Sequence, residues 1–195
     1  MKEIKLDDCL LKYPVLIDNV VMLIKDIILN DVPSEWTGYE SVICEPIQLG
    51  TKFMKILKRG WKNLLKNPSI LFKLNRSTIK LHFDMHHGYG NLDKAINLLD
   101  DDDRIEFKNF VNQNTKFNPH IMFITRPKII NKWFSKLFPW LEKCEKIFGF
   151  ENLKGFGLTR IYTFLAERFM SYWFQKNSKN TTMPIVFYDI RNDIK

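Results

Sequence analysis

The feature that most constrains the fold is an alternation of short apolar runs with long segments of helical periodicity. Val42–Cys44 and His120–Thr125 are compact, mostly apolar runs of the length that buried strands have. Pro127 begins a helical pattern that reaches about Phe148, and a second long pattern covers Leu158–Phe174. Because strands that alternate with helices are typical of α/β proteins, we expect a helix-rich α/β domain with a short mixed sheet.

Weaker patterns suggest the rest of the architecture. The other expected elements are a helix at Val15–Leu29, a basic helix at Thr51–Lys66, a strand at Ile79–Met85, a helix from Asn91 to Leu99, a helix that starts within Asp100–Asp103 and a last strand at Pro184–Ile190. The 195 residues fit one domain, with residues 1–31 as an N-terminal helical segment and residues 32–190 as the main region.

The composition narrows the class of protein. Cys9, Cys44 and Cys144 form no C-x-x-C pair, so we expect reduced thiols and neither a disulfide framework nor a zinc site. The N-terminus lacks the apolar core of a secretory signal, and charged residues interrupt the longest apolar segment, Val15–Leu29. We expect a cytoplasmic protein.

Positive charge concentrates in one amphipathic segment. The chain carries a formal charge of +8, and Lys52, Lys55, Lys58, Arg59 and Lys62 share the segment with regularly spaced apolar residues. One interpretation is peripheral contact with the anionic lipids of the inner membrane. The other is a helix packed by its apolar face with solvated lysines outside. A nucleic-acid-binding module is a third, less favoured interpretation, because no nucleic-acid motif accompanies the charge.

The stretch "HFDMHHGYGN", residues 82–91, contains three of the four histidines. In a strand, His82, Asp84 and His86 would project from one face, and such side chains can ligate zinc or iron. Successive members would lie ~7 Å apart, so one ion could rarely bind all three. A metal site would need a ligand from elsewhere, and His120 is the only other histidine. We therefore expect no metal here.

Two other interpretations of this stretch remain. The first is a polar strand face that ends in a turn at Gly88 and Gly90. The second is a strand end at the mouth of a cleft, where His86, His87 and Tyr89 would face a ligand, as residues at strand ends of α/β sheets often do.

Several segments, taken in order, resemble the C-terminal part of a bacterial glycosyltransferase family. They are "YESVICEPI", "TIKLHFDMHHGYGNLDKAINLL", "NPHIMFITR", "WLEKCEK" and "RIYTFLAERFMSYWF", and the resemblance covers about Val32 to Ile190. The strongest local match is R-x-x-x-F-L-x-E-R, here at residues 160–168. The family was long labelled a domain of unknown function and occurs in capsule and O-antigen loci. Its implied fold is GT-A-like, and one branch uses a galactofuranosyl donor.

The resemblance implies transfer of a sugar from a nucleotide-sugar donor to a surface polysaccharide. Such chemistry needs a base and positive charge for the leaving phosphates. We expect Glu167, Asp84 and His86 to act in catalysis, and His87, Tyr89, Arg160 and Arg168 to bind substrate. For Glu167 and Arg168 a structural ion pair is the alternative, since charges on a largely apolar helix must be paired or face a cleft. We expect Glu167 and His86 to line one hollow.

Two features bear on cofactors and partners. Many GT-A enzymes hold Mn²⁺ or Mg²⁺ with an Asp-x-Asp pair, and Asp100–Asp103 has this spacing, although acidic residues also favour a helix start. The family's N-terminal half, with its "HYRR"-type motif, has no counterpart here. The alternative to an active transferase is therefore a partial or inactive one that needs a second polypeptide.

Overall fold

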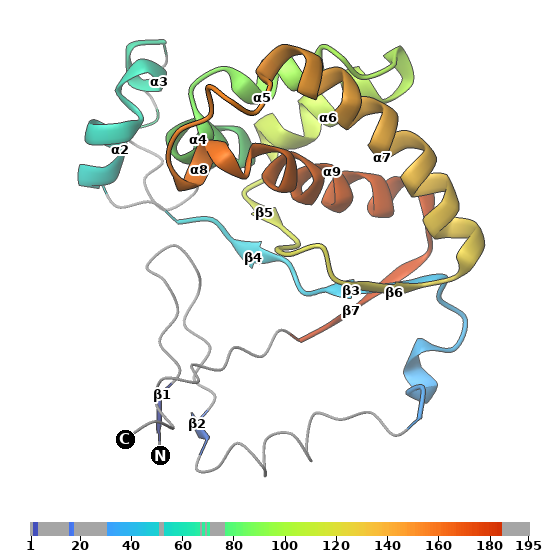
Figure 1. Ribbon diagram of the computed structural model, residues 1–195. Coiled ribbons are helices and arrows are strands. Elements are labelled where there is room, and N and C mark those ends of the chain that lie inside the picture. Colours follow the sequence, from blue (N-terminus) through green and yellow to red (C-terminus); the bar gives the residue numbers. More distant parts are fainter. Residues whose placement is uncertain are drawn as a thin grey trace.

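The computed structural model describes residues 2–3, 16–17, 31–50, 53–66, 68, 70 and 77–184 (Figure 1). Its elements in chain order are β1 (Lys2–Glu3), β2 (Leu16–Ile17), the 3-10 helix η1 (Ser34–Trp36), β3 (Ser41–Cys44), β4 (Ile47–Gln48), α2 (Phe53–Arg59), α3 (Trp61–Lys66), α4 (Ile79–His87), α5 (Asn91–Ile96), α6 (Asp101–Gln113), β5 (Lys116–Phe117), β6 (Phe123–Thr125), α7 (Pro127–Phe148), α8 (Phe156–Thr159), α9 (Ile161–Asn177) and β7 (Asn180–Met183). The expected fold class is confirmed, because the helices accompany a short mixed sheet.

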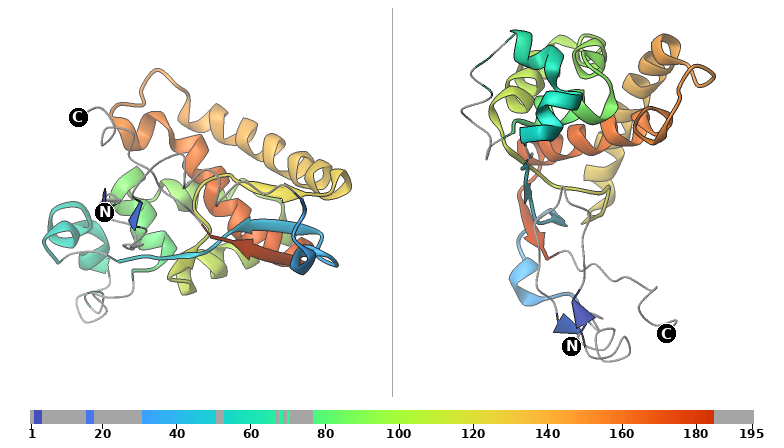
Figure 2. Two further views of the ribbon diagram at one scale, coloured as in Figure 1. Left: turned by 90° about the horizontal axis from the view of Figure 1, so that it is seen from below. Right: turned by 90° about the vertical axis from the view of Figure 1, so that its left-hand side faces the viewer.

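The mixed sheet has the strand order β6-β3-β7. Strand β3 runs antiparallel to β6 and parallel to β7, so that Ile43 lies opposite both Phe123 and Thr182. Ile43 is fully buried in the core, and Phe123 packs against it. The long helices lie against one face of the sheet, the face that contributes to the core (Figures 1 and 2). The strand expected at Val42–Cys44 is confirmed.

The other expected strands are confirmed only in part. The strand expected at His120–Thr125 is shorter and begins at Phe123. Strand β7 was not expected, and residues 185–190 of the expected last strand lie outside the described residues. Strands β4 and β5 form a separate antiparallel pair in which Ile47 lies opposite Phe117. This pair is too short to give a sequence signal.

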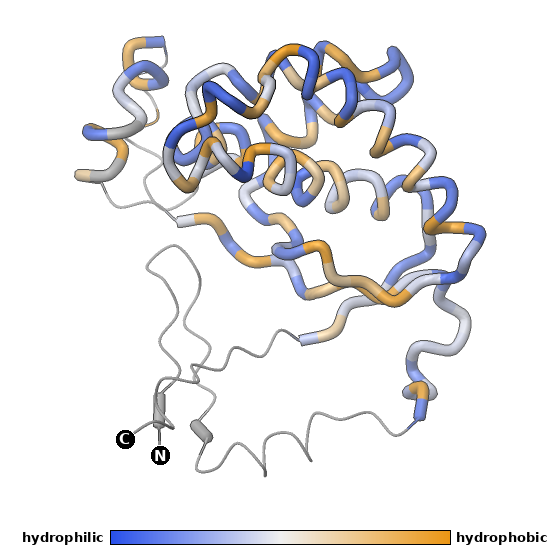
Figure 3. Tube along the Cα trace, in the orientation of Figure 1, coloured by the Kyte–Doolittle hydropathy of each residue, from blue (hydrophilic) through white to orange (hydrophobic). Residues whose placement is uncertain are grey.

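Aromatic side chains fill the space between the long helices. The ring of Phe107 on α6 contacts Trp140 on α7 and Phe169 on α9 edge to face. Trp140 also donates a hydrogen bond of 2.7 Å to the carbonyl oxygen of Ala95. Hydrophobic and hydrophilic positions alternate along α7 (Figure 3), whose bounds agree with the expected helix and which has Pro139 inside it. The helix expected to start within residues 100–103 is confirmed as α6.

The segment Ile79–Met85, expected as a strand, is helix α4. Thr78 caps the helix by accepting a hydrogen bond from the Leu81 backbone N–H, and the chain leaves it at Gly88 with φ 91°. The prediction was wrong because α4 is buried on almost all sides. The polar residues His82 and Asp84 are buried as well, so a two-residue alternation concealed the helical period.

Two other helix predictions need correction. The helix expected at Thr51–Lys66 is two helices, α2 and α3, with Gly60 between them. A Cβ atom at Gly60 would lie 2.9 Å from the carbonyl oxygen of Ile56 and 3.2 Å from Met85 Cγ, so glycine allows the two segments to pack on α4. The expected Asn91–Leu99 helix ends earlier, at Ile96.

The helix expected at Val15–Leu29 is contradicted at Leu16–Ile17, the two residues of it that the structure describes. Leu16–Ile17 pair with Lys2–Glu3 as antiparallel strands, and residues 18–30 lie outside the described residues. Within the part of the chain that the structure describes, no helix has both the length and the apolar character needed to cross a bilayer.

Candidate functional site

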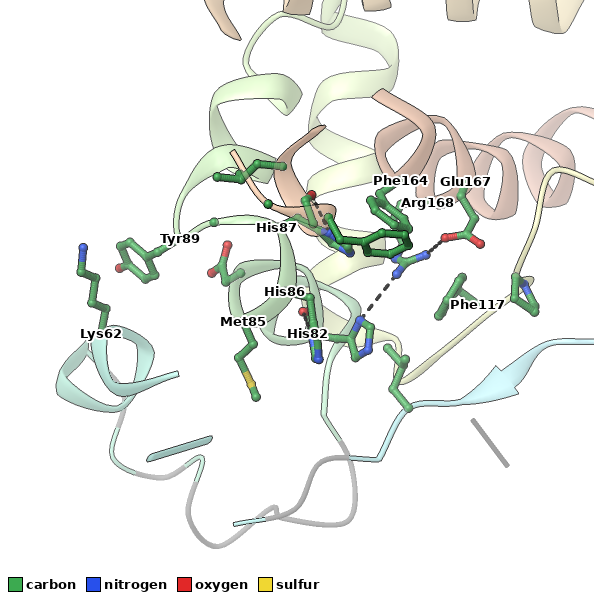
Figure 4. A pocket seen from close by; sticks show the side chains of 18 of the residues that line it. Lys62, His82, Met85, His86, His87, Tyr89, Phe117, Phe164, Glu167 and Arg168 are labelled. Atoms are coloured by element: carbon green, nitrogen blue, oxygen red, sulfur yellow. Dashed lines mark hydrogen bonds and ion pairs between the residues drawn. The ribbon is translucent and has the colours of Figure 1, made fainter. Parts of the chain in front are cut away.

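A cavity of about 990 Å³ lies where α4, α9, α8 and the β4–β5 pair meet (Figure 4). Polar and charged side chains line part of it, namely Lys62, His82, Asp84, His86, His87, His120, Lys154, Glu167 and Arg168. Apolar and aromatic side chains also line it, namely Ile47, Leu49, Trp61, Met85, Tyr89, Phe117, Pro119, Phe156, Leu158 and Phe164. Glu167 and His86, from helices far apart in the sequence, therefore line one hollow.

His82 and His86 lie one turn apart on α4, so their side chains share a face. Their rings stack with 4.3 Å between centroids. The Nδ1 atom of His86 lies 2.9 Å from the carbonyl oxygen of His82. A carbonyl can only accept, so this nitrogen carries the proton, and in the neutral ring the lone pair is on Nε2. His86 can therefore accept a proton at Nε2.

His87, which was expected to bind substrate, lines the cavity but is also held by contacts within the protein. Its side chain is buried, stacks on Phe164 at 3.9 Å between centroids, and donates from Nδ1 to the carbonyl oxygen of Gly157 at 3.0 Å. Burial lowers the pKa of His87 to about 3, with further lowering by the Arg168 charge. His87 is thus neutral and fixes the segment before α9 against α4.

Asp84 is also held by the protein. One carboxylate oxygen accepts from Lys80 Nζ at 2.8 Å, and the other accepts from the Gly90 backbone N–H at 3.2 Å. Burial raises the pKa of Asp84, and the Lys80 interaction opposes this rise. Lys80 also binds Asp93 at 2.8 Å. This expected catalytic carboxylate lines the cavity, but its bonds give it a structural role at the turn after α4.

Tyr89 lies at the end of the cavity away from Glu167, next to Lys62 (Figure 4). Lysine ammonium groups surround its ring, with Lys62, Lys66 and Lys80 at 5.9, 5.3 and 6.0 Å from the centroid. Lys80 is paired with Asp84 and Asp93, so Lys62 and Lys66 are the cations that this end offers to an anionic group.

Glu167 and Arg168 form an ion pair at the other end of the cavity. Arg168 Nη1 donates to Glu167 Oε2, and Glu167 Oε1 accepts from the His120 backbone N–H at 2.5 Å. The guanidinium is only 2% exposed, lies 3.6 Å from the Phe117 ring centroid, and donates from Nη2 to His82 Nδ1 at 3.5 Å. Glu167 and Arg168 are therefore an ion pair that also lines the cavity.

Arg160 lies outside the cavity lining, contrary to the role expected for it. Its guanidinium packs over the rings of Phe156 and Phe164, at 5.0 and 5.8 Å from their centroids. Both rings line the cavity. Arg160 therefore contacts two aromatic residues of the cavity lining.

Sequence reasoning missed the segment Phe117–His120. Asn118 donates from its backbone to Ser171 Oγ at 2.9 Å and from its side chain to the Cys44 carbonyl oxygen at 2.6 Å. Cys44 Sγ in turn donates to the Pro119 carbonyl oxygen at 2.5 Å. The signal that could have found this wall is the Asn-Pro dipeptide, which marks a turn directly before a histidine.

The carboxylates near the cavity do not fit a divalent cation. Asp84 and Glu167 are already paired with Lys80 and Arg168. Among the described residues, no group of three or more His, Cys, Asp or Glu side chains is arranged to hold a metal.

The Asp-x-Asp candidate at Asp100–Asp103 lies away from this cavity. Asp100 binds Lys143 at 3.1 Å, and Asp103 binds Lys176 at 3.2 Å. Residues 101–103 form the first turn of α6, where acidic side chains favour helix formation. Their lysine partners explain these aspartates without a metal.

Helices α2 and α3 present a mixed basic and apolar surface beside the cavity. Lys58 and Lys62 are exposed, whereas Lys52 and the side chains of Lys55 and Arg59 lie outside the described residues. Apolar side chains are exposed on the same helices, with Met54 at 59%, Leu57 at 40%, Trp61 at 51% and Leu65 at 74%. Trp61 and Lys62 belong both to this surface and to the cavity lining.

Comparison with known proteins gives one match. The sequence model of a family described as a domain of unknown function (DUF4422) matches residues 48–178, which include every residue of the cavity lining except Ile47. No curated protein and no solved structure matches the chain at a significant level.

Proposed function

The chain belongs to the DUF4422 family, and we propose that it is a glycosyltransferase-type domain that moves a sugar from a nucleotide-sugar donor to a growing surface polysaccharide. The observation that carries the proposal is the cavity, in which a proton-accepting histidine, buried and exposed cations and aromatic rings converge. The sequence resemblance to glycosyltransferases of capsule and O-antigen synthesis supplies the reaction class.

The size and lining of the cavity suit this substrate class. Ligand pockets typically measure ~300–1,000 Å³, so a cavity of about 990 Å³ can hold a sugar with part of a second ligand. Aromatic side chains such as Trp61 and Tyr89 offer flat surfaces to a sugar ring or a nucleobase. Lys62 and the cations around Tyr89 offer charge to a diphosphate.

His86 is the best candidate for the base. In a direct displacement, the acceptor hydroxyl oxygen attacks the anomeric carbon of the donor sugar as the bond from that carbon to the phosphate oxygen breaks. The hydroxyl proton passes to Nε2 of His86, and the nucleoside diphosphate leaves with the bonding electron pair. This route inverts the anomeric configuration. The oxygens of Asp84 and Glu167 accept hydrogen bonds from Lys80, Gly90, His120 and Arg168, and we assign structural roles to these two carboxylates.

We also infer peripheral association with an anionic membrane surface. The exposed lysines of α2 and α3 complement anionic headgroups, and the exposed Trp61 and Leu65 can enter the interfacial region. Residues 51–66 contain no acidic residue that would oppose this contact. Membrane binding there would place the cavity at the lipid surface.

The test is turnover of a nucleotide-sugar panel by the purified chain, followed as released nucleotide, with and without oligosaccharide acceptors and Mn²⁺. We expect release from at least one donor and a loss of at least about a hundredfold in His86→Ala. The control is Asn112→Ala, an exposed residue of α6.

Other outcomes would favour the rival functions. Turnover that needs a second polypeptide would show a partial transferase. No turnover of any donor, together with a salt-sensitive shift of nucleic acid in a gel, would replace the proposal by nucleic-acid binding.

A further inference from the structure

His120 has a backbone conformation that is uncommon for a residue other than glycine. Its φ is +60°, and among the described residues it is the one non-glycine residue with a positive φ. A Cβ atom is crowded in this region of backbone space, so any side chain larger than hydrogen destabilises the fold there. Glycine would make the same turn without this steric cost.

The surrounding structure holds this conformation from several sides. The backbone N–H of His120 donates to Glu167 Oε1 at 2.5 Å. The two residues before it are fixed by Ser171, which accepts from the Asn118 N–H at 2.9 Å, and by Cys44, which donates to the Pro119 carbonyl oxygen at 2.5 Å. Strained backbone that its surroundings enforce in this way is concentrated at functional sites.

The side chain of His120 lies where it can act on a ligand. His120 lines the cavity, as His86, Glu167 and Arg168 do, and the residue is exposed. The enforced backbone conformation therefore holds this imidazole at the cavity.

We propose that His120 is a ligand-contacting residue of the cavity and that Glu167 is the positioning residue that holds it there. The imidazole would hydrogen-bond a hydroxyl or phosphate oxygen of the bound substrate. The identity of that substrate as a nucleotide sugar rests on the proposed function. The inference that the backbone of His120 is strained does not depend on the proposed function.

The first experiment compares the melting temperature and donor affinity of His120→Gly with those of the wild type. We expect the melting temperature to rise by about 2–4 °C, as the strain is removed, while donor affinity falls at least tenfold. The matched control is Asn114→Gly, at a residue with φ −83°, where glycine should lower the melting temperature and leave affinity unchanged. His120→Asn should keep part of the affinity, because asparagine tolerates positive φ and retains a polar group.

The second experiment separates positioning from catalysis at Glu167. Glu167→Gln retains an oxygen that can accept from the His120 N–H, so at 20 °C it should keep affinity and turnover within about fivefold of wild type. Glu167→Ala should lose affinity as His120→Gly does. An inactive Glu167→Gln that binds donor normally would make Glu167 the base and overturn its positioning role.

The results also distinguish this inference from the proposed function. A His120→Gly variant with wild-type affinity, or with an unchanged or lower melting temperature, overturns the inference even if the wild type turns over a donor. If the wild type binds no nucleotide sugar, the proposed function fails. The melting temperature of His120→Gly then decides the inference alone, and a value no higher than that of the wild type overturns it.

Discussion

The Nδ1 atom of His87 lies 3.0 Å from the carbonyl oxygen of Gly157. This hydrogen bond joins the end of α4 to α8, and both elements form walls of the cavity. His87, which the sequence suggested as a substrate-binding residue, thus connects helices α4 and α8 at the cavity.

The His87 connection predicts a loss of stability in acid. The folded-state pKa is lowered from 6.5 to about 3, so below pH 6.5 the unfolded chain takes up a proton that the folded chain excludes. The contribution of His87 is present above pH 6.5 and should fall by up to about 1.4 kcal/mol per unit as the pH drops towards 3. Urea unfolding at pH 7.5, 6.5 and 5.5 measures this. His87→Gln, which retains an N–H donor, should reduce the slope, and an unchanged slope would contradict the assignment.

Gly157 should tolerate no side chain. A Cβ atom there would lie 2.0 Å from the carbonyl oxygen of His86, a backbone atom that cannot move aside easily. We expect Gly157→Ala to destabilise the protein by about 1–3 kcal/mol in urea unfolding. Gly50→Ala is the matched control, because Gly50 has open space around its Cβ position, and its effect should stay within about 0.5 kcal/mol. Equal effects of the two substitutions would show that α8 does not pack on α4 as described.

Lys80 should stabilise the fold because it neutralises the buried carboxylate of Asp84. Burial lowers the pKa of Lys80, but its hydrogen bonds to Asp84 and Asp93 raise it overall, so it is charged. Lys80→Met leaves the buried Asp84 carboxylate without its cation and should cost about 1–3 kcal/mol at pH 7. The double variant with Asp84→Asn should recover most of this, and Lys94→Met, an exposed lysine of α5, should change little. Additive effects of the Lys80 and Asp84 changes would refute the coupling.

The surface of α2 and α3 should bind anionic vesicles. Cosedimentation with phosphatidylglycerol-containing vesicles should exceed that with neutral phosphatidylcholine vesicles and decrease with added salt. At ~1 kcal/mol per lysine, Lys58→Glu with Lys62→Glu should weaken binding by at least about thirtyfold. The same reversal at Lys128 and Lys132, exposed on α7, is the control. Equal partitioning into both vesicle types would remove the membrane inference.

The sequence predicted the elements that carry a clear local pattern. Helix α7 was predicted because a helical periodicity dominates it, and strand β3 because it is a short apolar run that is buried throughout. Helix α4 was mistaken for a strand because His82, Asp84 and His87 are buried together with its apolar residues. Strands β4 and β5 have two residues each and depend on tertiary pairing alone.

Part of the site was predictable in the same way. The convergence of His86 and Glu167 was anticipated, because polar residues in largely apolar segments must be paired or face a cleft. The role of His120 depends on its backbone angle and its bond to Glu167, which residue types and spacing do not reveal. The same holds for Asp84 and His87, whose partners Gly90 and Gly157 contribute only backbone atoms.

The central claim is that this cavity binds a nucleotide sugar, and isothermal titration of a donor panel into the wild type, Trp61→Ala and Trp36→Ala tests it most directly. Trp61 lines the cavity, whereas Trp36 lies in η1 outside it. We predict measurable affinity of the wild type for at least one donor, a loss of at least tenfold in Trp61→Ala and no loss in Trp36→Ala. Absence of binding by every donor, or equal affinities of the wild type and Trp61→Ala, would contradict the claim.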